Sequence, residues 1–261
     1  MLIDLRNKVA IVTGAGRGIG RVIARTLAAE GVAVAALDIR EDLLEELASE
    51  WRGAGWHGLQ RVCDIRDADA VARAVAAADD EFGRLDILVN NAGIAAGERV
   101  EALDEAVWDG NFDANLKGTF LMCRAVIPAM QRQRSGCIIN ASSFAAIIPS
   151  IGGAAYAASK AGLVSFTRVL AGELGPHGIT VNCYAPGMIP TEMNHYAEAP
   201  PERQQVLLDT LTLRRWGRAE DVANVICFLA SDQAAYITGT MIDVSGGKFA
   251  TQMPWIAHRE S

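Results

Sequence analysis

Short runs of apolar, β-branched residues alternate along the chain with longer, alanine-rich segments whose apolar positions recur at helical spacing. The short runs predict strands at residues 8–13, 32–38, 59–63, 85–90, 137–141, 180–184 and 241–244. The longer segments predict helices near residues 18–30, 41–51, 68–82, 104–131, 154–174 and 220–229. This alternation is typical of βαβ units, so we expect an α/β protein with about seven parallel strands and helices on both faces of the sheet.

Connections between parallel strands are right-handed, which favours a doubly wound, Rossmann-type sheet whose ligand crevice lies beyond the carboxyl ends of the strands. We expect residues 1–261 to form a single domain of this type. One connection is unusual, because residues 187–216 are rich in Pro and polar side chains and are too long for an ordinary link. We expect this stretch to be a mobile lid over a substrate.

Composition and charge narrow the classes of function. The net charge of -7 argues against a nucleic-acid partner, because such binding depends on clustered Lys and Arg. The sequence has neither a signal-peptide layout nor an apolar run of the roughly 20 residues that a membrane helix needs, so we expect a cytoplasmic protein without a membrane partner. The cysteines lack CxxC spacing and the histidines are scattered, which predicts buried thiols and no metal site.

A glycine-rich turn follows the first predicted strand and leads into a helix. Gly14, Gly18 and Gly20 leave the main chain open, so that N–H groups of the turn, including those of Arg17 and Ile19, can face a pyrophosphate at the helix N-terminus. A glycine-rich turn can also serve only to reverse the chain direction, without binding a ligand. The position on the first strand of a βαβ unit nevertheless favours a dinucleotide site.

Carboxylates end the next two predicted strands. Asp38 can accept hydrogen bonds from an adenosine ribose and would repel a 2′-phosphate, which favours NAD over NADP. Arg17 and Arg40 keep NADP open, because either guanidinium could neutralise that phosphate. Asp64 and Ile65 could bracket the adenine, or Asp64 could instead cap the helix that follows.

Tyr156 and Lys160 lie four residues apart in a predicted helix, a spacing that places them on one face. A free phenol has a pKa of about 10 and is a poor base at neutral pH unless a nearby ammonium stabilises the phenolate. The pair therefore has a use in proton transfer. Taken alone, the same spacing is also typical of a surface pair.

Further short motifs accompany this pair. They are TGxxxGIG at residues 13–20, Asn90-Asn91-Ala92-Gly93, Asn115, Ser143, Tyr156-x-x-x-Lys160 and Pro186-Gly187. In this order and at these spacings the chain resembles the short-chain dehydrogenase/reductase family over about residues 5–247.

The resemblance implies roles for the catalytic residues. Tyr156 would be the general acid/base, and Lys160 would lower its pKa and bind the nicotinamide ribose. Ser143 would hydrogen-bond the substrate oxygen, with the adjacent Ser142 as the competing candidate, and the spacing to Tyr156 selects Ser143. Asn115 would hold a water that connects Lys160 to solvent.

The same resemblance completes the cofactor site. The run at residues 90–93 would stabilise the sheet and line the adenosine ribose, with Asn90 in direct contact and with a purely structural role still open for Asn91 and Gly93. After the sixth strand, a short segment would bind the nicotinamide carboxamide. The residues expected at the cofactor from these two segments are Asn90, Ala92, Gly93, Pro186, Gly187, Ile189 and Thr191.

The substrate pocket is expected from residues 95–99, 144–150, Met188 and 190–216. Apolar walls are expected from Phe144, Ile147, Ile148, Ile151, Met188 and Met193, and polar recognition from Glu98, Glu192, Asn194 and His195. The resemblance further implies a homotetramer that packs through helices 104–131 and 154–174. The apolar tail at residues 248–261 is expected to dock onto a neighbouring subunit.

We therefore expect hydride transfer between NAD(H) and a small-molecule substrate, namely a secondary alcohol or ketone, a polyol or a sugar hydroxyl. The alternatives are an NADPH-dependent 3-oxoacyl or other carbonyl reductase, an isomerase or dehydratase on the same scaffold, and a dinucleotide-binding protein without catalysis. The presence of Tyr156, Lys160, Ser143 and Asn115 together argues against the last of these.

Overall fold

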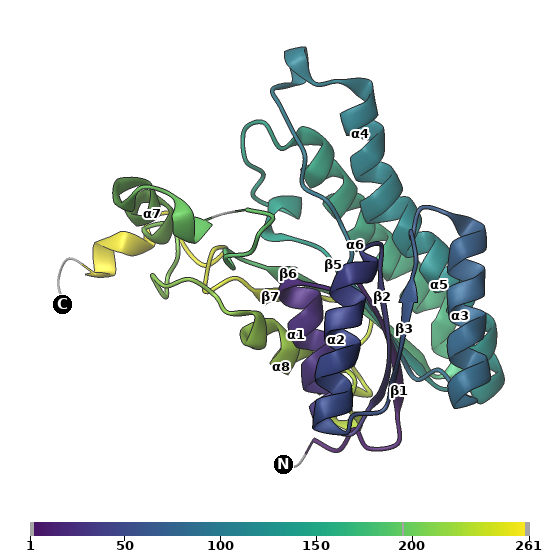
Figure 1. Cartoon of the computed structure of the whole chain (residues 1–261). Coiled ribbons are helices and arrows are strands. Elements are labelled where there is room, and N and C mark those ends of the chain that lie inside the picture. Colours follow the sequence, from purple (N-terminus) through teal and green to yellow (C-terminus); the bar gives the residue numbers. More distant parts are fainter. Residues whose placement is uncertain (1–2, 195, 259–261) are drawn as a thin grey trace.

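A sheet of parallel strands forms the centre of the molecule (Figure 1). The computed structural model describes residues 3–194 and 196–258. Within these residues seven strands pair in the order β3-β2-β1-β4-β5-β6-β7, each pair parallel. The strands are β1 Val9–Thr13, β2 Ala33–Asp38, β3 Gly58–Val62, β4 Ile87–Asn90, β5 Gly136–Ala141, β6 Ile179–Pro186 and β7 Met241–Val244. The predicted Rossmann-type fold is confirmed.

Helices cover both faces of this sheet. Helices α1, α2 and α8 pack on one face, and α3, α5 and α6 pack on the other, while α4 lies against α6 (Figure 1). The helices are α1 Gly18–Ala29, α2 Glu41–Ala54, α3 Ala68–Phe82, α4 Glu105–Phe112, α5 Gly118–Gln133, α6 Ala154–Leu174, α7 Pro201–Leu208 and α8 Ala219–Leu229. None of the described helices is both long enough and apolar enough to cross a bilayer.

The side chains of β1 show why its sequence is apolar throughout. Ala10 and Val12 join one buried cluster with Leu27 of α1, whereas Ile11 joins the opposite cluster with Val126 of α5. Successive strand residues point to opposite faces, so a strand covered on both sides needs an apolar residue at every position. The two clusters together form the core.

The strand order reverses between β1 and β4. β2 and β3 lie on one side of β1, and β4 to β7 lie on the other. Such a switch point opens a crevice at the carboxyl ends of the two central strands. The glycine-rich turn after β1 and the segment after β4 therefore face the same space.

Two segments differ from the predicted elements. The helix expected over residues 104–131 is α4 and α5 joined by a π-helical turn, Asp113–Lys117, which the continuous apolar pattern did not reveal. The stretch expected as an irregular lid contains α7. Pro200 and Pro201 appear as helix breakers in the sequence, yet Pro201 is the first residue of α7, where the missing N–H costs nothing.

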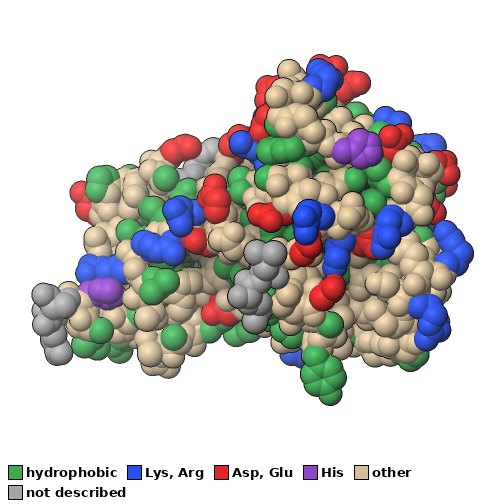
Figure 2. All heavy atoms as spheres, turned by 90° about the horizontal axis from the view of Figure 1, so that it is seen from below, with side chains coloured by type: hydrophobic (Ala, Val, Ile, Leu, Met, Phe, Trp, Pro, Cys, Tyr) green, Lys and Arg blue, Asp and Glu red, His purple; other side chains and the backbone are tan. Residues whose placement is uncertain are grey.

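Charged side chains of both signs are interspersed on the face shown in Figure 2. Several charged residues of the protein pair with a residue close by in sequence, such as Arg66 with Asp64 and Arg84 with Asp86, both at 2.7 Å. The five cysteines are buried and unbridged.

Candidate active site

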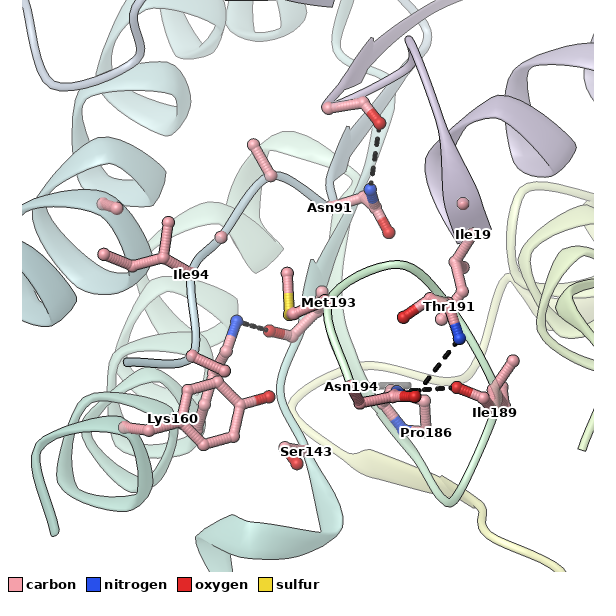
Figure 3. Close-up of a pocket in the computed structure, with 18 of the residues that line it drawn as sticks. Ile19, Asn91, Ile94, Ser143, Lys160, Pro186, Ile189, Thr191, Met193 and Asn194 are labelled. Carbon is pink, nitrogen blue, oxygen red and sulfur yellow. Dashed lines mark hydrogen bonds between the residues drawn. The ribbon is translucent and has the colours of Figure 1, made fainter. Parts of the chain in front are cut away.

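A cavity of about 740 Å³ crosses the carboxyl ends of the strands, and Figure 3 shows part of its lining. Its volume lies in the ordinary range for ligand pockets, roughly 300–1,000 Å³. One end is lined by Asp38 and Asp64, and the other by Ser143 and Tyr156. The predicted residues that the cavity brings together are Gly14, Arg17, Gly18, Ile19, Asp38, Asp64, Ile65, Ala92, Gly93, Ser143, Tyr156, Lys160, Pro186, Gly187, Ile189 and Thr191.

The glycine-rich turn fits a dinucleotide because side chains are excluded where it packs. Gly14 has a φ of +65°, and a Cβ there would lie 2.9 Å from the Cα of Ala92. Gly20 was expected at the cofactor, but it does not line the cavity. A Cβ on Gly20 would collide with the carbonyl oxygen of Gly14, so this glycine allows α1 to pack against the turn instead. The resulting cradle leaves room for a pyrophosphate at the α1 N-terminus.

Asp38 lies at the end of β2 and organises the turn. Its Oδ2 accepts a hydrogen bond from the Gly16 N–H at 2.8 Å, and its Oδ1 accepts one from the Arg40 N–H at 3.0 Å. The nearby guanidinium groups are paired with other carboxylates, Arg40 with Asp42 at 2.8 Å and Arg17 with Glu192 at 2.6 Å. The carboxylate of Asp38 is thus held in place by main-chain donors rather than by a cation.

Asp64 and Ile65 line the cavity at the end of the next strand. Asp64 does not cap the following helix. That role belongs to Asp67, whose side chain accepts from the Asp69 N–H at 2.8 Å and the Ala70 N–H at 3.1 Å. The pKa of Asp64 is lowered, chiefly because its carboxylate accepts hydrogen bonds from Arg66.

Asn90 was expected to contact the cofactor, but it does not line the cavity. Its side chain is buried in the sheet, where Nδ2 donates to Oδ1 of Asn140 at 2.9 Å. Asn91 lines the cavity instead (Figure 3). A one-residue shift at a strand end moves a side chain to the other face, and the sequence alone did not settle that register.

Asn91 joins the glycine-rich turn to β6. Its Nδ2 donates to the carbonyl oxygens of Thr13 at 3.2 Å and Gly14 at 3.4 Å. Its Oδ1 accepts from the hydroxyl of Tyr184 at 3.1 Å, and Tyr184 is fully buried and lines the cavity. Tyr184 was not among the predicted site residues, although its place two residues before Pro186 puts it at the carboxyl end of a strand.

Tyr156 and Ser143 meet at the other end of the cavity. Burial raises the pKa of Tyr156 above its ordinary value, and the neighbouring Ser143 hydroxyl lowers it by a smaller amount. Ser143 Oγ also accepts from the Ala145 N–H at 3.1 Å. Ser142 instead donates to the Lys160 carbonyl oxygen at 3.1 Å, which leaves Ser143 as the serine that faces Tyr156.

Lys160 lies one helical turn from Tyr156 with its ammonium buried. Nζ donates to the carbonyl oxygen of Ala141 at 2.7 Å and lies 5.8 Å from the centre of the Tyr156 ring (Figure 3). Burial lowers the pKa of Lys160 to about 8. Nζ is directed to Ala141 rather than to the phenol, and the lowering of the Tyr156 pKa by this ammonium stays a prediction.

Asn115 lies in the π-helical turn behind the cavity and does not line it. Its Oδ1 accepts from the Ile94 N–H at 2.9 Å, and its Nδ2 donates to Ser159 Oγ at 3.0 Å. A Cβ on Gly93 would lie 2.7 Å from Asn115 Oδ1 and 3.3 Å from Lys160 Nζ. Asn115 therefore packs next to Lys160, with its side chain engaged by protein partners.

Comparison with known proteins matches this arrangement over nearly the whole chain. The family model described as enoyl-(acyl carrier protein) reductase matches residues 14–248. A 3-oxoacyl-[acyl-carrier-protein] reductase of Thermotoga maritima is 39% identical over 243 residues, which cover 93% of this chain and 98% of the relative. The chain belongs to the short-chain dehydrogenase/reductase family.

Other members of the family share the match. The BbsD subunit of the (2S)-[(R)-hydroxy(phenyl)methyl]succinyl-CoA dehydrogenase of Thauera aromatica is 41% identical over 244 residues, covering 94% of this chain and 97% of the relative. The crystal structure of a putative short-chain alcohol dehydrogenase from Sinorhizobium meliloti superposes with a TM-score of 0.91 at 38% identity, covering 96% of this chain and 100% of that one. As a short-chain dehydrogenase/reductase, the chain is an oxidoreductase that uses a nicotinamide dinucleotide.

The substrate side of this dehydrogenase/reductase matches the predicted pocket only in part. Ala95, Phe144, Ala145, Ser150, Glu192, Met193 and Asn194 line the cavity, together with Tyr196, which was included only within the range 190–216. Of the described residues expected there, Met188 and Glu98 do not line it, and Ile147, Ile148 and Ile151 are exposed. Met188 packs instead with Phe144 and Leu211. His195 lies outside the described residues.

Asn194 holds the segment after β6 in shape (Figure 3). Its Nδ2 donates to the Ile189 carbonyl oxygen at 2.8 Å, and its Oδ1 accepts from the Thr191 N–H at 3.2 Å. These bonds keep Ile189 and Thr191 at the cavity. The described residues contain no group of three or more His, Cys, Asp and Glu side chains that could hold a metal.

The C-terminal tail contacts the stretch after α7 of its own chain. Gln252 and Trp255 line a second cavity, of about 350 Å³, together with Thr210 and Arg214 from the stretch after α7. His258 Nε2 lies 2.9 Å from the Thr212 carbonyl oxygen. The described part of the tail thus packs against residues 206–214 of the same subunit, and docking onto a neighbour remains a prediction.

Proposed function

We propose that the enzyme transfers a hydride between NAD(H) and a secondary alcohol or ketone, including a polyol or sugar hydroxyl, with Tyr156 as the general acid/base. The observation that carries this proposal is the convergence of Tyr156, Ser143 and Lys160 at one end of a cavity whose other end is lined by Asp38. When bound, the dinucleotide supplies or accepts the hydride. The chain's own residues supply orientation and the proton.

The protonation of Tyr156 supports this role. Because burial raises its pKa, the phenol is protonated at neutral pH and can donate its proton to a carbonyl oxygen during reduction. Alcohol oxidation needs the reverse transfer, from the substrate hydroxyl to the phenolate. Ser143 and Tyr156 line the same end of the cavity, so the two groups are positioned to bind the same substrate oxygen.

Lys160 and the cradle support the binding of the dinucleotide. Among the described residues the Lys160 ammonium has one acceptor, the Ala141 carbonyl oxygen, and it keeps further donors for ribose hydroxyls. Gly14 and Gly18 would hold the pyrophosphate, and Pro186 and Thr191 would meet the carboxamide. These residues fit a dinucleotide because all of them line the same cavity.

The preference for NAD over NADP is part of the proposal. Asp38 offers carboxylate oxygens at the adenosine end, and the neighbouring Arg17 and Arg40 are paired with carboxylates. A 2′-phosphate there would meet a negative charge and would have to break an ion pair to gain a cation. An adenosine ribose with a free 2′-hydroxyl carries no phosphate charge, so it is not repelled by Asp38 and has no need to break an ion pair.

The test of the chemistry is Tyr156→Phe, with Tyr236→Phe as the control on an exposed tyrosine. We expect Tyr156→Phe to lower turnover by roughly 10²–10⁴ while NADH binding, followed by fluorescence titration, stays within a factor of two or so. The Tyr236→Phe variant should behave as wild type. Near-normal turnover in Tyr156→Phe would refute the assignment of the acid/base.

A second candidate function is an NADPH-dependent 3-oxoacyl reductase. The identity to 3-oxoacyl-[acyl-carrier-protein] reductases of Thermotoga maritima and Staphylococcus aureus, 39% and 42%, favours it. Titration with NADH and NADPH in parallel, followed by assays on simple ketones, polyols and 3-oxoacyl thioesters, separates the two. Tighter NADPH binding together with thioester reduction would select this second function.

We also propose a homotetramer that packs through the α4–α5 segment and α6. Apolar side chains on these helices remain exposed, namely Trp108, Phe120 and Val169. Burying them between subunits would remove apolar surface from water. A molar mass of one subunit in light scattering would exclude this assembly.

A further inference from the structure

An ion pair joins the glycine-rich turn to the segment after β6. Arg17 Nη1 lies 2.6 Å from Glu192 Oε2, and 175 residues separate the two in sequence. Both side chains also line the cavity. This ion pair therefore spans the space that the dinucleotide would occupy, between the glycine-rich turn and the segment after β6.

Glu192 acts on a second guanidinium as well. The pKa of Arg40 is raised chiefly by its hydrogen bonds to Asp42, and the charges of Asp38 and Glu192 raise it further. The adenosine end of the cavity is lined by three carboxylates, Asp38, Asp64 and Glu192, and by three guanidinium groups, Arg17, Arg40 and Arg66. Asp42, which pairs with Arg40, adds a fourth carboxylate beside them, so the local charge is slightly negative, and Glu192 comes from the segment after β6.

We propose that Glu192 is a specificity-determining residue that disfavours NADPH by occupying Arg17. This inference rests on the proposed oxidoreductase function and deepens its cofactor preference. A 2′-phosphate gains affinity from a charge-assisted bond with a guanidinium. To reach Arg17, the phosphate must displace the Glu192 carboxylate and then remain near its negative charge.

The expected effect of Glu192 on NADPH affinity is small, because exposed ion pairs contribute little free energy. About half of the Arg17 side chain and two thirds of the Glu192 side chain are exposed, so water and salt screen their attraction. Removing the carboxylate should therefore increase the affinity for NADPH by about twofold to fivefold. NADH has no 2′-phosphate, so its affinity should stay within a factor of about two.

The experiment is the titration of Glu192→Gln with NADH and with NADPH, by fluorescence and calorimetry, at low and at physiological salt. We expect the Kd for NADPH to fall by the stated factor, more at low salt, while the Kd for NADH is unchanged. Glu202→Gln is the matched control, because it removes the same charge from α7, which does not line the cavity. In an Arg17→Gln background, Glu192→Gln should no longer improve NADPH binding.

Three results would overturn the proposal. These are an unchanged NADPH affinity in Glu192→Gln, an equal gain for NADH, or the same gain in Glu202→Gln. If the wild type binds NADPH more tightly than NADH, the proposed NAD preference fails. The role of Glu192 is still decided separately, by the difference between Glu192→Gln and wild type.

Discussion

Replacing Lys160 by Met should make the protein more stable and much less active. The Lys160 ammonium is buried without a carboxylate partner, and its only protein acceptor among the described residues is the Ala141 carbonyl oxygen. A methionine fills a similar volume without a charge. Buried charges are costly when they are not paired, so the replacement removes a destabilising group.

The magnitude follows from the pKa of Lys160, which burial lowers from 10.5 to about 8. At about 1.36 kcal/mol per pKa unit, the buried charge costs about 3 kcal/mol at neutral pH. The lost hydrogen bond to Ala141 offsets about 1 kcal/mol of the gain. We therefore expect Lys160→Met to raise the free energy of unfolding by about 2 kcal/mol at pH 7.

This gain should depend on pH in a definite direction. Between pH 8 and 10.5 the unfolded chain binds more protons at Lys160 than the folded chain does, so the stability of the wild type rises with pH. Lys160→Met lacks this contribution, and its advantage should disappear near pH 10, a rough estimate from the same linkage. Other titrating groups are common to both proteins and cancel in the comparison.

The assay is urea unfolding followed by circular dichroism at several pH values between 7 and 10. Lys117→Met is the control, because Lys117 is exposed and paired with Asp113 at 3.2 Å, so its replacement should change stability by no more than about 0.5 kcal/mol. If Lys160→Met were less stable than wild type at pH 7, or if the difference were the same at pH 7 and pH 10, the reasoning would be refuted.

Two other predictions concern Tyr184 and Tyr156. Tyr184→Phe removes the hydroxyl that donates to Asn91 Oδ1, so Asn91 no longer holds the glycine-rich turn as firmly. We expect the affinity for NADH to fall by about fivefold while kcat is nearly unchanged. Titration and steady-state assays in parallel measure the two quantities. Equal losses in kcat and in affinity would contradict this positioning role. Because burial raises the pKa of Tyr156, alcohol oxidation should increase with pH by up to about tenfold per unit between pH 7 and 9, while carbonyl reduction changes little. An oxidation rate that levels off below pH 8 would show that Tyr156 titrates lower.

The fold was predictable because each βαβ unit repeats the same local pattern. Apolar strands, helical spacing and the turn after β1 are properties of neighbouring residues. Tyr156 and Lys160 lie on α6, and Ser143 follows the end of β5. Such local signals do not depend on the rest of the chain.

The errors arose where the outcome depended on a single residue or on distant parts of the chain. Asn90 and Asn91 are chemically identical, and only the pairing of β4 with β5 decides which one faces the cavity. The contact between Arg17 and Glu192 cannot be read from the sequence, because it requires the segment after β6 to fold back over the turn. The direction of Lys160 Nζ toward Ala141 likewise depends on how α6 packs on β5.

The central place of β1 has a consequence for folding kinetics. β1 pairs with β2, which follows closely in sequence, and also with β4, so that Ala10 lies beside Ile87. Contacts of long sequence separation form late, because the chain must first close a large loop. The main chain of Asn91 and Ala92, just after β4, donates to Thr13 Oγ1 at 3.0 Å and holds the turn in place. A nascent or refolding chain therefore acquires its nucleotide cradle only when the fourth strand has docked, and not when the glycine-rich turn itself first forms.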